Sequence, residues 1–157
     1  MNSTLTRVIL AIGALLVLGA VNLSIKDKED IKANGVTVLL ELAPVDPRSL
    51  MQGDYMALRF AIAQTVDVTS GYTEARLPLQ VDEHRVGRLA PSDRTANLHI
   101  RYRVRNGQLW IGTNAFFFEE GTSNRYTLAR YGEFRVEPKW GDAVLVGLRD
   151  EHYQPLH

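Results

Sequence analysis

The chain has 157 residues, which suits one domain, and its 45% hydrophobic and 23% charged residues are typical of a globular protein rather than a disordered one. It carries 18 basic and 18 acidic side chains, and because residues 1–25 hold one arginine and no acid, the remainder is also close to neutral. This balance gives no global electrostatic argument for nucleic-acid binding, so we expect no such partner. The absence of cysteine excludes disulfides and thiolate metal sites.

The N-terminal segment predicts a transmembrane helix. From Leu5 to Ile25 only Arg7 is charged, and residues 8–21 are apolar without a break. A helix of this length reaches about 30 Å, which matches the hydrocarbon thickness of a bilayer. We therefore predict a tail at 1–6, a signal-anchor helix in the lipid bilayer at 7–25, a linker at 26–35 and a soluble domain at 36–157.

Two other interpretations of this segment are open from the sequence. A cleaved signal peptide also has a basic start and a short apolar stretch, and Leu18-Gly19-Ala20 is a weak cleavage site. A buried core helix fits less well, because such a helix normally has a polar face and this segment has none.

Short alternating segments separated by turn residues follow the anchor. Strands are predicted at 36–43, 54–64, 77–81, 86–89, 96–105, 108–112, 115–118, 133–137 and 143–149. Asn106-Gly107 predicts a two-residue hairpin turn, because both positions tolerate positive φ. A short helix is expected over 125–131. The fold class is thus mainly β, a small antiparallel barrel or sandwich with one short helix, preceded by the transmembrane helix.

Three strands carry more detailed predictions. In the strand at 54–64, the inward side chains are expected to be Met56, Leu58, Phe60 and Ile62. The aromatic run at 116–118 suggests burial on both faces. The strand at 143–149 is apolar on both faces and is the best candidate for a central strand.

One predicted strand has a basic face. Along residues 98–105, His99, Arg101, Arg103 and Arg105 alternate with apolar side chains, so the basic set shares one side. A solvated strand face explains this pattern, and contact with anionic lipid headgroups or an acidic partner is the alternative.

The segment 44–60 combines turn chemistry with paired charges. Pro44 and Pro47 fix φ and remove amide donors, so the chain must leave the sheet there. Gly53 and Asp54 favour a turn. Asp46 could cap the turn that follows it, and Arg48 could form an ion pair with Asp46 or Asp54. The segment therefore predicts a corner between two strands.

This segment resembles the GDYXXLXY family of bacterial membrane-anchored proteins. Read from Gly53, it nearly spells Gly-Asp-Tyr-x-x-Leu-x-Tyr, with Phe60 in place of the final tyrosine. Residues 44–48 resemble the Pro-x-Asp-Pro-Arg stretch of the family, 117–121 its aromatic-acid-glycine segment, and 147–148 a Gly-Leu near its C-terminal end. The resemblance covers most of the chain, and the positions it carries over are Asp46, Arg48, Gly53, Asp54, Tyr55, Leu58 and Glu119.

The resemblance implies a single-pass protein of the bacterial inner membrane with a periplasmic or otherwise extracytoplasmic domain and no assigned activity. Counting basic residues in the flanks favours the opposite orientation, because Lys26, Lys28 and Lys32 follow the span whereas Arg7 precedes it. The family supplies no catalytic role for any of the shared positions.

Enzymatic interpretations are weaker. A hydrolase would use Asp54 or Glu119 as acid or base, and Ser49 lacks a Gly-x-Ser-x-Gly elbow. Membrane signal peptidases also carry a stretch similar to Leu50 to Asp54, but Val45 stands where their serine should be. Lys139 is the only lysine after Lys32.

Metal and cofactor sites are not predicted. The histidines at 84, 99, 152 and 157 lack the short spacings of common metal sites. Asp46, Asp54 and Glu119 could converge as oxygen ligands, although loop carboxylates more often act as caps and ion pairs. We therefore expect no cofactor. The leading hypothesis is a non-catalytic module that acts with another integral membrane protein through the Asp46 to Tyr55 loop, and a membrane-anchored hydrolase that uses motif carboxylates is the alternative.

Overall fold

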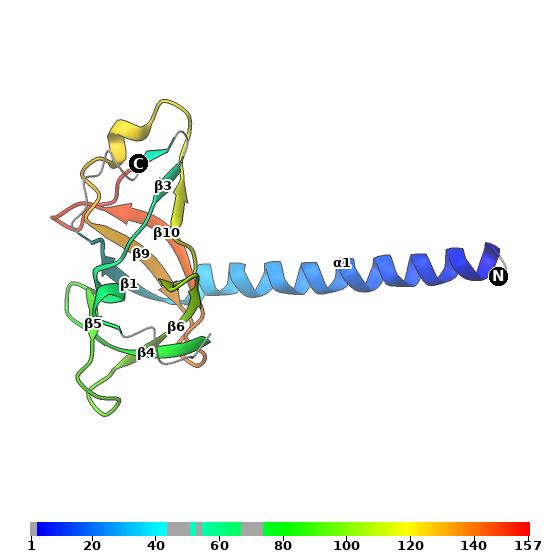
Figure 1. The fold of residues 1–157 in the computed structure, drawn as a ribbon, viewed down its shortest axis with the longest axis horizontal. Helices are drawn as coiled ribbons and strands as arrows, with labels where there is room; N and C mark the ends of the chain where they lie inside the picture. The colour runs from blue at the N-terminus through cyan, green and yellow to red at the C-terminus, as the bar shows by residue number, and fades with distance from the viewer. Residues whose placement is uncertain (1–2, 44–50, 53–54, 67–73) are drawn as a thin grey trace.

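A computed structural model describes residues 3–43, 51–52, 55–66 and 74–157. Helix α1 (Ser3–Asn34) projects from one side of a β-rich domain (Figure 1). The residues predicted as a linker therefore continue the helix up to Asn34. None of its apolar window is buried, which rules out a core helix, and the helix is long and apolar enough to cross a membrane.

The part of the domain that the structure describes contains ten short strands. They are β1 (Val36–Glu41), β2 (Met51–Gln52), β3 (Tyr55–Ala57), β4 (Glu74–Val81), β5 (Gly87–Leu89), β6 (Leu98–Arg105), β7 (Gln108–Trp110), β8 (Ala115–Phe117), β9 (Tyr131–Val136) and β10 (Ala143–Arg149). Among the described residues, the 3-10 helices η1 (Ala61–Gln64) and η3 (Ser123–Tyr126) lie between strands.

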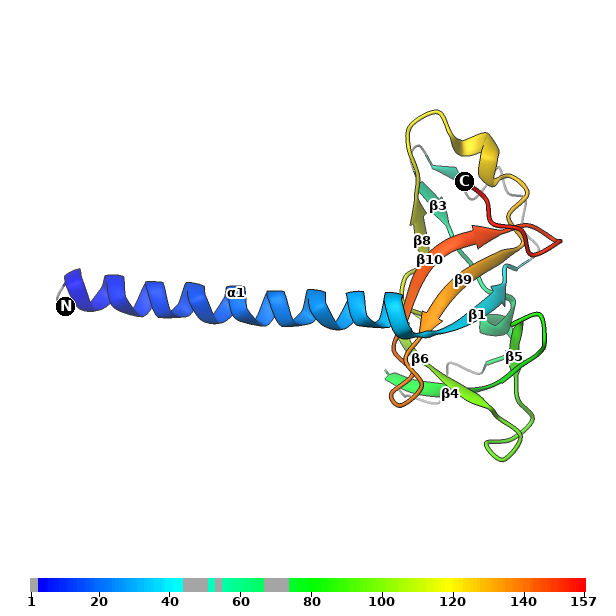
Figure 2. The same cartoon turned by 180° about the vertical axis from the view of Figure 1, so that it is seen from behind.

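The strands form three antiparallel sheets, with strand orders β1-β9-β10, β2-β3-β8 and β5-β4-β6-β7. Isolated bridges tie them together, one between Leu39 and Val86 and another between Leu42 and Phe60. The sheets curve around one core as a half-barrel, which Figure 2 shows from behind. The prediction of a mainly β, antiparallel domain behind an apolar helix is confirmed.

In the segment predicted as a strand over 54–64, the burial of side chains agrees with the prediction, but the extent of the strand does not. Met56, Leu58, Phe60 and Ile62 are all buried, as expected. The strand itself is shorter, however, because β3 ends at Ala57 and η1 follows. Phe60 packs edge-on against Phe134 from β9, with ring centroids 5.3 Å apart.

The predicted hairpin at Asn106-Gly107 is confirmed. Both residues have positive φ, 51° and 71°, and Arg105 pairs with Gln108 across the turn. Sequence and structure agree here because a two-residue turn depends only on local backbone preferences.

Two predictions in the C-terminal half are wrong. The central strand of its sheet is β9, whereas β10 lies at the edge. The apolar outer face of β10 adjoins the foot of α1, where Val144 lines an open cleft together with Ile25 and Lys28. The short helix is the 3-10 turn η3, and the chain is already in β9 at Tyr131.

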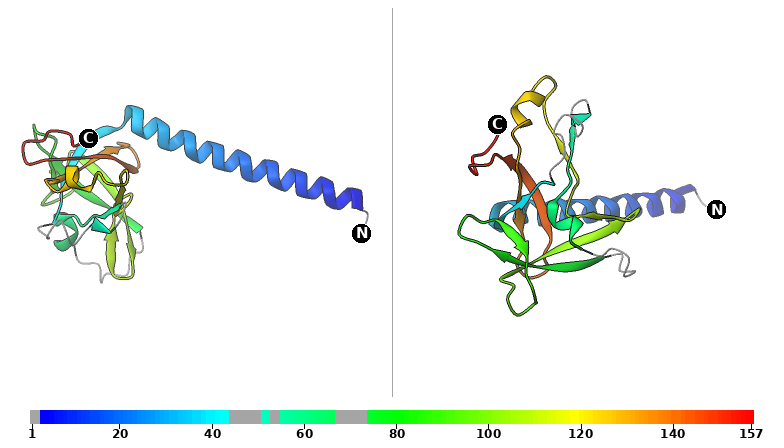
Figure 3. Two further views of the ribbon diagram at one scale, coloured as in Figure 1. Left: turned by 90° about the horizontal axis from the view of Figure 1, so that it is seen from above. Right: turned by 60° about the vertical axis from the view of Figure 1, so that its left-hand side comes forward.

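The foot of α1 contacts β9 and β10 of the β1-β9-β10 sheet, and the rest of the helix extends away from the domain (Figure 3). Ile31 is buried there, and its carbonyl accepts the Gly35 N–H at 2.8 Å. Because β1 begins at Val36, the helix passes directly into the sheet. This short connection couples the position of the domain to the helix.

Candidate functional site

The structure brings together two of the segments singled out by the sequence. Strand β3 pairs antiparallel with β8, so that Tyr55 lies opposite Phe117. Their rings are 5.7 Å apart at an interplanar angle of 41°. The tyrosine of the Gly-Asp-Tyr stretch therefore contacts the start of the aromatic-acid-glycine segment, although the two are far apart in the chain.

Only part of the predicted site can be placed. Asp46, Arg48, Gly53 and Asp54 lie outside the described residues. Tyr55 is half-buried in β3, opposite Gln52 of β2 on its other side. Leu58 is 1% exposed and belongs to the core, so packing accounts for this position.

Phe117 corrects the expectation that the aromatic run is buried on both faces. Its side chain is 74% exposed, whereas Phe116 and Phe118 are half-buried. Tyr126 of η3 packs against both of these neighbours, with ring centroids 5.1 Å and 5.3 Å away. The 3-10 turn thus covers one side of β8 and leaves Phe117 in solvent.

Glu119 lies beside a surface hollow of about 470 Å³. The hollow is lined by Phe117, Phe118, Glu119, Thr122, Arg125, Tyr126 and His157. Glu119 is exposed, and its carbonyl accepts hydrogen bonds from the Thr122 N–H at 3.0 Å and the Thr122 hydroxyl at 2.6 Å. The turn therefore holds the Glu119 backbone and leaves its carboxylate at the rim. Arg125 and His157 were not predicted here, because nothing local in the sequence links them to β8.

The histidines considered for catalysis lie in separate places. His99 is 3.2 Å from the exposed Asp93, His84 stacks on Tyr153 with centroids 5.0 Å apart, and His152 is 3.9 Å from Glu151. Ser49, the serine considered with them, lies outside the described residues. Within the part of the chain that the structure describes, no three His, Asp or Glu side chains gather into a possible metal site.

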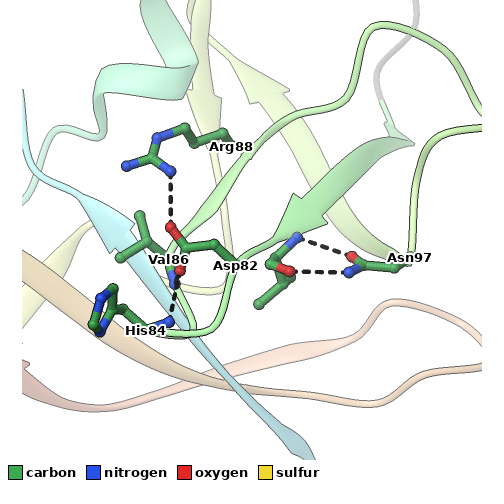
Figure 4. A network of polar contacts seen from close by, with 6 residues as sticks. Asp82, His84, Val86, Arg88 and Asn97 are labelled. Carbon is green, nitrogen blue, oxygen red and sulfur yellow. Dashed lines mark hydrogen bonds and ion pairs between the residues drawn. The ribbon is translucent and has the colours of Figure 1, made fainter.

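A second polar cluster, around Asp82, was not singled out from the sequence. Its Oδ1 accepts the His84 and Val86 N–H groups at 2.9 Å, and its Oδ2 accepts from Arg88 at 2.8 Å (Figure 4). Burial opposes ionisation, but the bonds from Val86 and Arg88 outweigh it, and the pKa of Asp82 lies below its ordinary value of 3.8. The carboxylate shapes the turn that leads into β5, which is a structural role.

The third cluster is the basic face of β6. As predicted, Leu98 and Ile100 are buried while Arg103 and Arg105 are exposed on the opposite side. Arg101 lies 3.3 Å from Asp142, and the Arg105 guanidinium lies 5.7 Å from the Trp110 ring centroid. These side chains line a groove that also contains Lys28 of α1. No local pattern in the sequence predicts that Lys28 and β6 lie together.

The profile of the GDYXXLXY protein family matches residues 17–148. This range covers most of the chain, including the end of α1 and both strands of the Tyr55–Phe117 contact. The chain belongs to the GDYXXLXY family. No curated protein and no solved structure matches it.

The positions that define the family can now be located in the structure. Within this GDYXXLXY domain, Tyr55 belongs to the Gly-Asp-Tyr stretch and Phe117 to the aromatic-acid-glycine segment, and the pairing of β3 with β8 brings them together. The final tyrosine position of the name-giving pattern holds Phe60, which is 1% exposed. In this chain that position therefore serves the core.

Proposed function

We propose that this protein is a membrane-anchored, non-catalytic interaction module that binds another integral membrane protein. Residues 7–25 of α1 would hold it in the bacterial inner membrane as a single-pass protein. The binding surface would be the β3–β8 face, which we define as Tyr55, Phe117, Glu119 and Arg125, and the proposal adds Asp46, Arg48, Gly53 and Asp54 on the basis of the sequence alone. The observation that carries the proposal is the exposure of Phe117 beside the family tyrosine.

An exposed phenylalanine on an edge strand is favourable for binding rather than for folding. Phe117 is 74% exposed, and β8 is an edge strand of the described β2-β3-β8 sheet. Full burial of such a side chain against a partner stabilises a complex by about 1.5–3 kcal/mol. Aromatic residues are also enriched in the buried centres of interfaces.

Charges surround this aromatic centre. Glu119 and Arg125 are both exposed and both line the hollow next to Phe117. Such an arrangement, with an apolar centre and a polar rim, resembles known protein interfaces. Opposite charges at the rim favour one orientation of the partner over others.

The position of the face supports a membrane partner. Strand β8 lies on the side of the domain from which α1 projects (Figures 1 and 2). With α1 in a bilayer, this side would face the membrane surface. A partner that contacts it would therefore have to rise from the same membrane.

Crosslinking in intact membranes tests this function. A photoreactive residue replaces Phe117 in the full chain, and the adducts are identified after detergent extraction. We expect one integral membrane protein to dominate, and Tyr55→Ala, Glu119→Arg, Asp46→Ala and Arg48→Ala to reduce its adduct when combined with the probe. Leu89→Ala on the exposed part of β5 is the matched control and should leave the adduct unchanged.

The folding of each variant is followed by thermal unfolding of the purified protein in detergent. If the folded variants all yield the wild-type adduct, or if the probe at Phe117 yields no adduct with a membrane protein, the proposal fails.

We further propose that the domain lies outside the cytoplasm, as the family resemblance implies. Lys26, Lys28 and Lys32 would then lie on the outer side, against the charge count. Reporters fused after His157 test this directly, because an enzyme active only in the periplasm should work there and a cytoplasmic fluorescent reporter should not. The reverse result would place the domain in the cytoplasm.

A further inference from the structure

We infer that the membrane protein partner adds a β-strand to the outer edge of β8, so that backbone hydrogen bonds hold it as well as contacts with the Phe117 ring. This inference deepens the proposed function and rests on it, because it concerns the same β3–β8 face. The bound segment is extended and places an apolar side chain opposite Phe117. Strand addition of this kind is a recurrent mode of peptide recognition.

Strand β8 has an edge that no other described strand covers. It pairs with β3 on one side, and it is the last strand in the order β2-β3-β8 (Figure 2). A sheet edge presents backbone donors and acceptors that another extended chain can satisfy. Which of these groups point outward depends on the hydrogen bonds between β3 and β8.

One hydrogen bond beside the two strands fixes this pattern. The Leu58 N–H donates to the Asn114 carbonyl at 2.7 Å, so these two residues form a hydrogen-bonded pair. They continue the register that places Tyr55 opposite Phe117. Hydrogen-bonded and non-hydrogen-bonded pairs alternate along an antiparallel ladder, and Tyr55–Phe117 is an odd number of pairs away. The N–H and carbonyl of Phe117 therefore point away from β3, toward the open edge.

Ala115 supports the same pattern independently. Its N–H donates to the Thr113 hydroxyl at 3.2 Å, and its carbonyl accepts from that hydroxyl at 3.2 Å. Both backbone groups of Ala115 thus also point away from β3. Proteins commonly protect their sheet edges, and Thr113 does so here for Ala115 while leaving the Phe117 end open.

The surroundings of Phe117 favour an extended segment over a helix. Its ring is 74% exposed, and directly opposite side chains on neighbouring strands are close enough to pack. Glu119 and Arg125 line the adjoining hollow of about 470 Å³, where flanking side chains of opposite charge can lie. A helix could cover the ring, but its backbone groups are bonded internally and would leave the N–H and carbonyl of Phe117 without partners.

Disulfide mapping tests the geometry, because the chain has no cysteine of its own. The photo-adduct from position 117 first identifies the contact segment of the partner. Ala115→Cys is then combined with single cysteines at consecutive positions of that segment. We expect the disulfide yield to alternate with a period of two, because successive side chains of a strand point to opposite faces. Phe117→Cys in place of Ala115→Cys should shift the maximum by two positions.

Two substitutions of Phe117 separate its backbone from its ring. Phe117→Ala and Phe117→Pro both remove the ring, but proline also removes the outward N–H. Proline is tolerated on an edge strand when that N–H faces outward, so pairing with β3 remains possible. Co-purification of the partner in detergent should show about fivefold weaker binding for the proline variant, through the loss of one hydrogen bond. Equal binding by the two folded variants would overturn strand addition.

Thr113 provides a test that keeps the ring. Thr113→Val removes the hydroxyl with little change of shape and frees the Ala115 N–H and carbonyl for the added strand. Binding should strengthen about fivefold or more. Thr113→Ser keeps the hydroxyl and is the matched control, with binding equal to that of wild type. Equal binding by the valine and serine variants would also overturn the inference.

The mapping distinguishes failure of this inference from failure of the proposed function. A disulfide pattern with a period of three to four positions would indicate a helical segment. Such a pattern, or a uniform yield at all positions, would overturn strand addition and leave the membrane partner in place. An adduct from position 117 only within the same chain, or only between two copies of it, would show that the protein covers its own edge and would overturn both.

Discussion

Arg149 donates from Nε to the carboxylate of Glu133 at 2.8 Å, across the strands β10 and β9. The Glu133 side chain is only 11% exposed, and Arg149 also donates to the Tyr153 carbonyl at 2.6 Å. The pair therefore fastens the C-terminal segment over the outer face of the β1-β9-β10 sheet. An acid within a central strand is retained because its carboxylate is satisfied there.

Replacement of Glu133 by glutamine should lower the free energy of unfolding by about 1–3 kcal/mol, because the amide cannot replace the charged acceptor in a mostly buried site. Glu41→Gln is the control, since its pair with Arg130 at 2.9 Å is 41% and 48% exposed. That exposed pair should contribute no more than about 1 kcal/mol. Denaturant unfolding in detergent measures the free energy of unfolding of both variants. Equal decreases for Glu133→Gln and Glu41→Gln would contradict the prediction that the buried pair contributes more.

Gly132 in β9 has no room for a side chain. A Cβ there would lie 3.0 Å from the Phe60 ring and 3.3 Å from both Phe134 and Leu145. Gly132→Ala should therefore destabilise the domain by about 1–3 kcal/mol through overpacking. Gly147→Ala on the neighbouring strand is the control, because its Cβ would meet only a Glu133 oxygen at 4.0 Å. Thermal unfolding should separate the two, and a neutral Gly132→Ala would show that the rings can move aside.

Asp82 predicts an acid-dependent loss of stability. Because its pKa is lowered in the folded state, its contribution is present above the unfolded pKa near 3.8 and is lost as pH falls through the folded value. Asp82→Asn keeps an acceptor for the backbone amides but loses the charge that pairs with Arg88. The variant should be less stable than wild type at pH 6, with the difference shrinking below about pH 4. Denaturant midpoints across this range give the result, and a difference independent of pH would contradict it.

The anchor makes a prediction of its own. If residues 7–25 are retained, the protein extracted from membranes should have the intact mass of all 157 residues and should resist alkaline carbonate. Leu15→Arg places a charge near the centre of the span, where arginine costs about 2.5–3.5 kcal/mol on insertion scales. Membrane recovery should therefore fall, whereas Thr4→Arg in the tail should have little effect. A mature protein that lacks the first twenty residues or so would instead indicate a cleaved signal peptide.

Local chemistry explains why several features were predictable from the sequence. The apolar run of α1, the Asn106-Gly107 turn and the alternation along β6 depend on residues close to one another in the chain. The inward set that contains Met56 and Phe60 was likewise visible as a period of two, even though β3 ends early. Such patterns survive because each reflects the burial or the backbone conformation of its own segment.

The tertiary structure decided what those segments contact. The edge position of β10, the exposure of Phe117, its contact with Tyr55 and the meeting of Lys28 with the arginines of β6 all join residues that are distant in the chain. Apolar composition does not decide whether a face is covered: α1 contacts β10, whereas η3 leaves Phe117 exposed. The sequence by itself determined the long apolar N-terminal helix, the β class and the family. Long-range packing decided which family residues form a surface and which, such as Leu58 and Phe60, belong to the core.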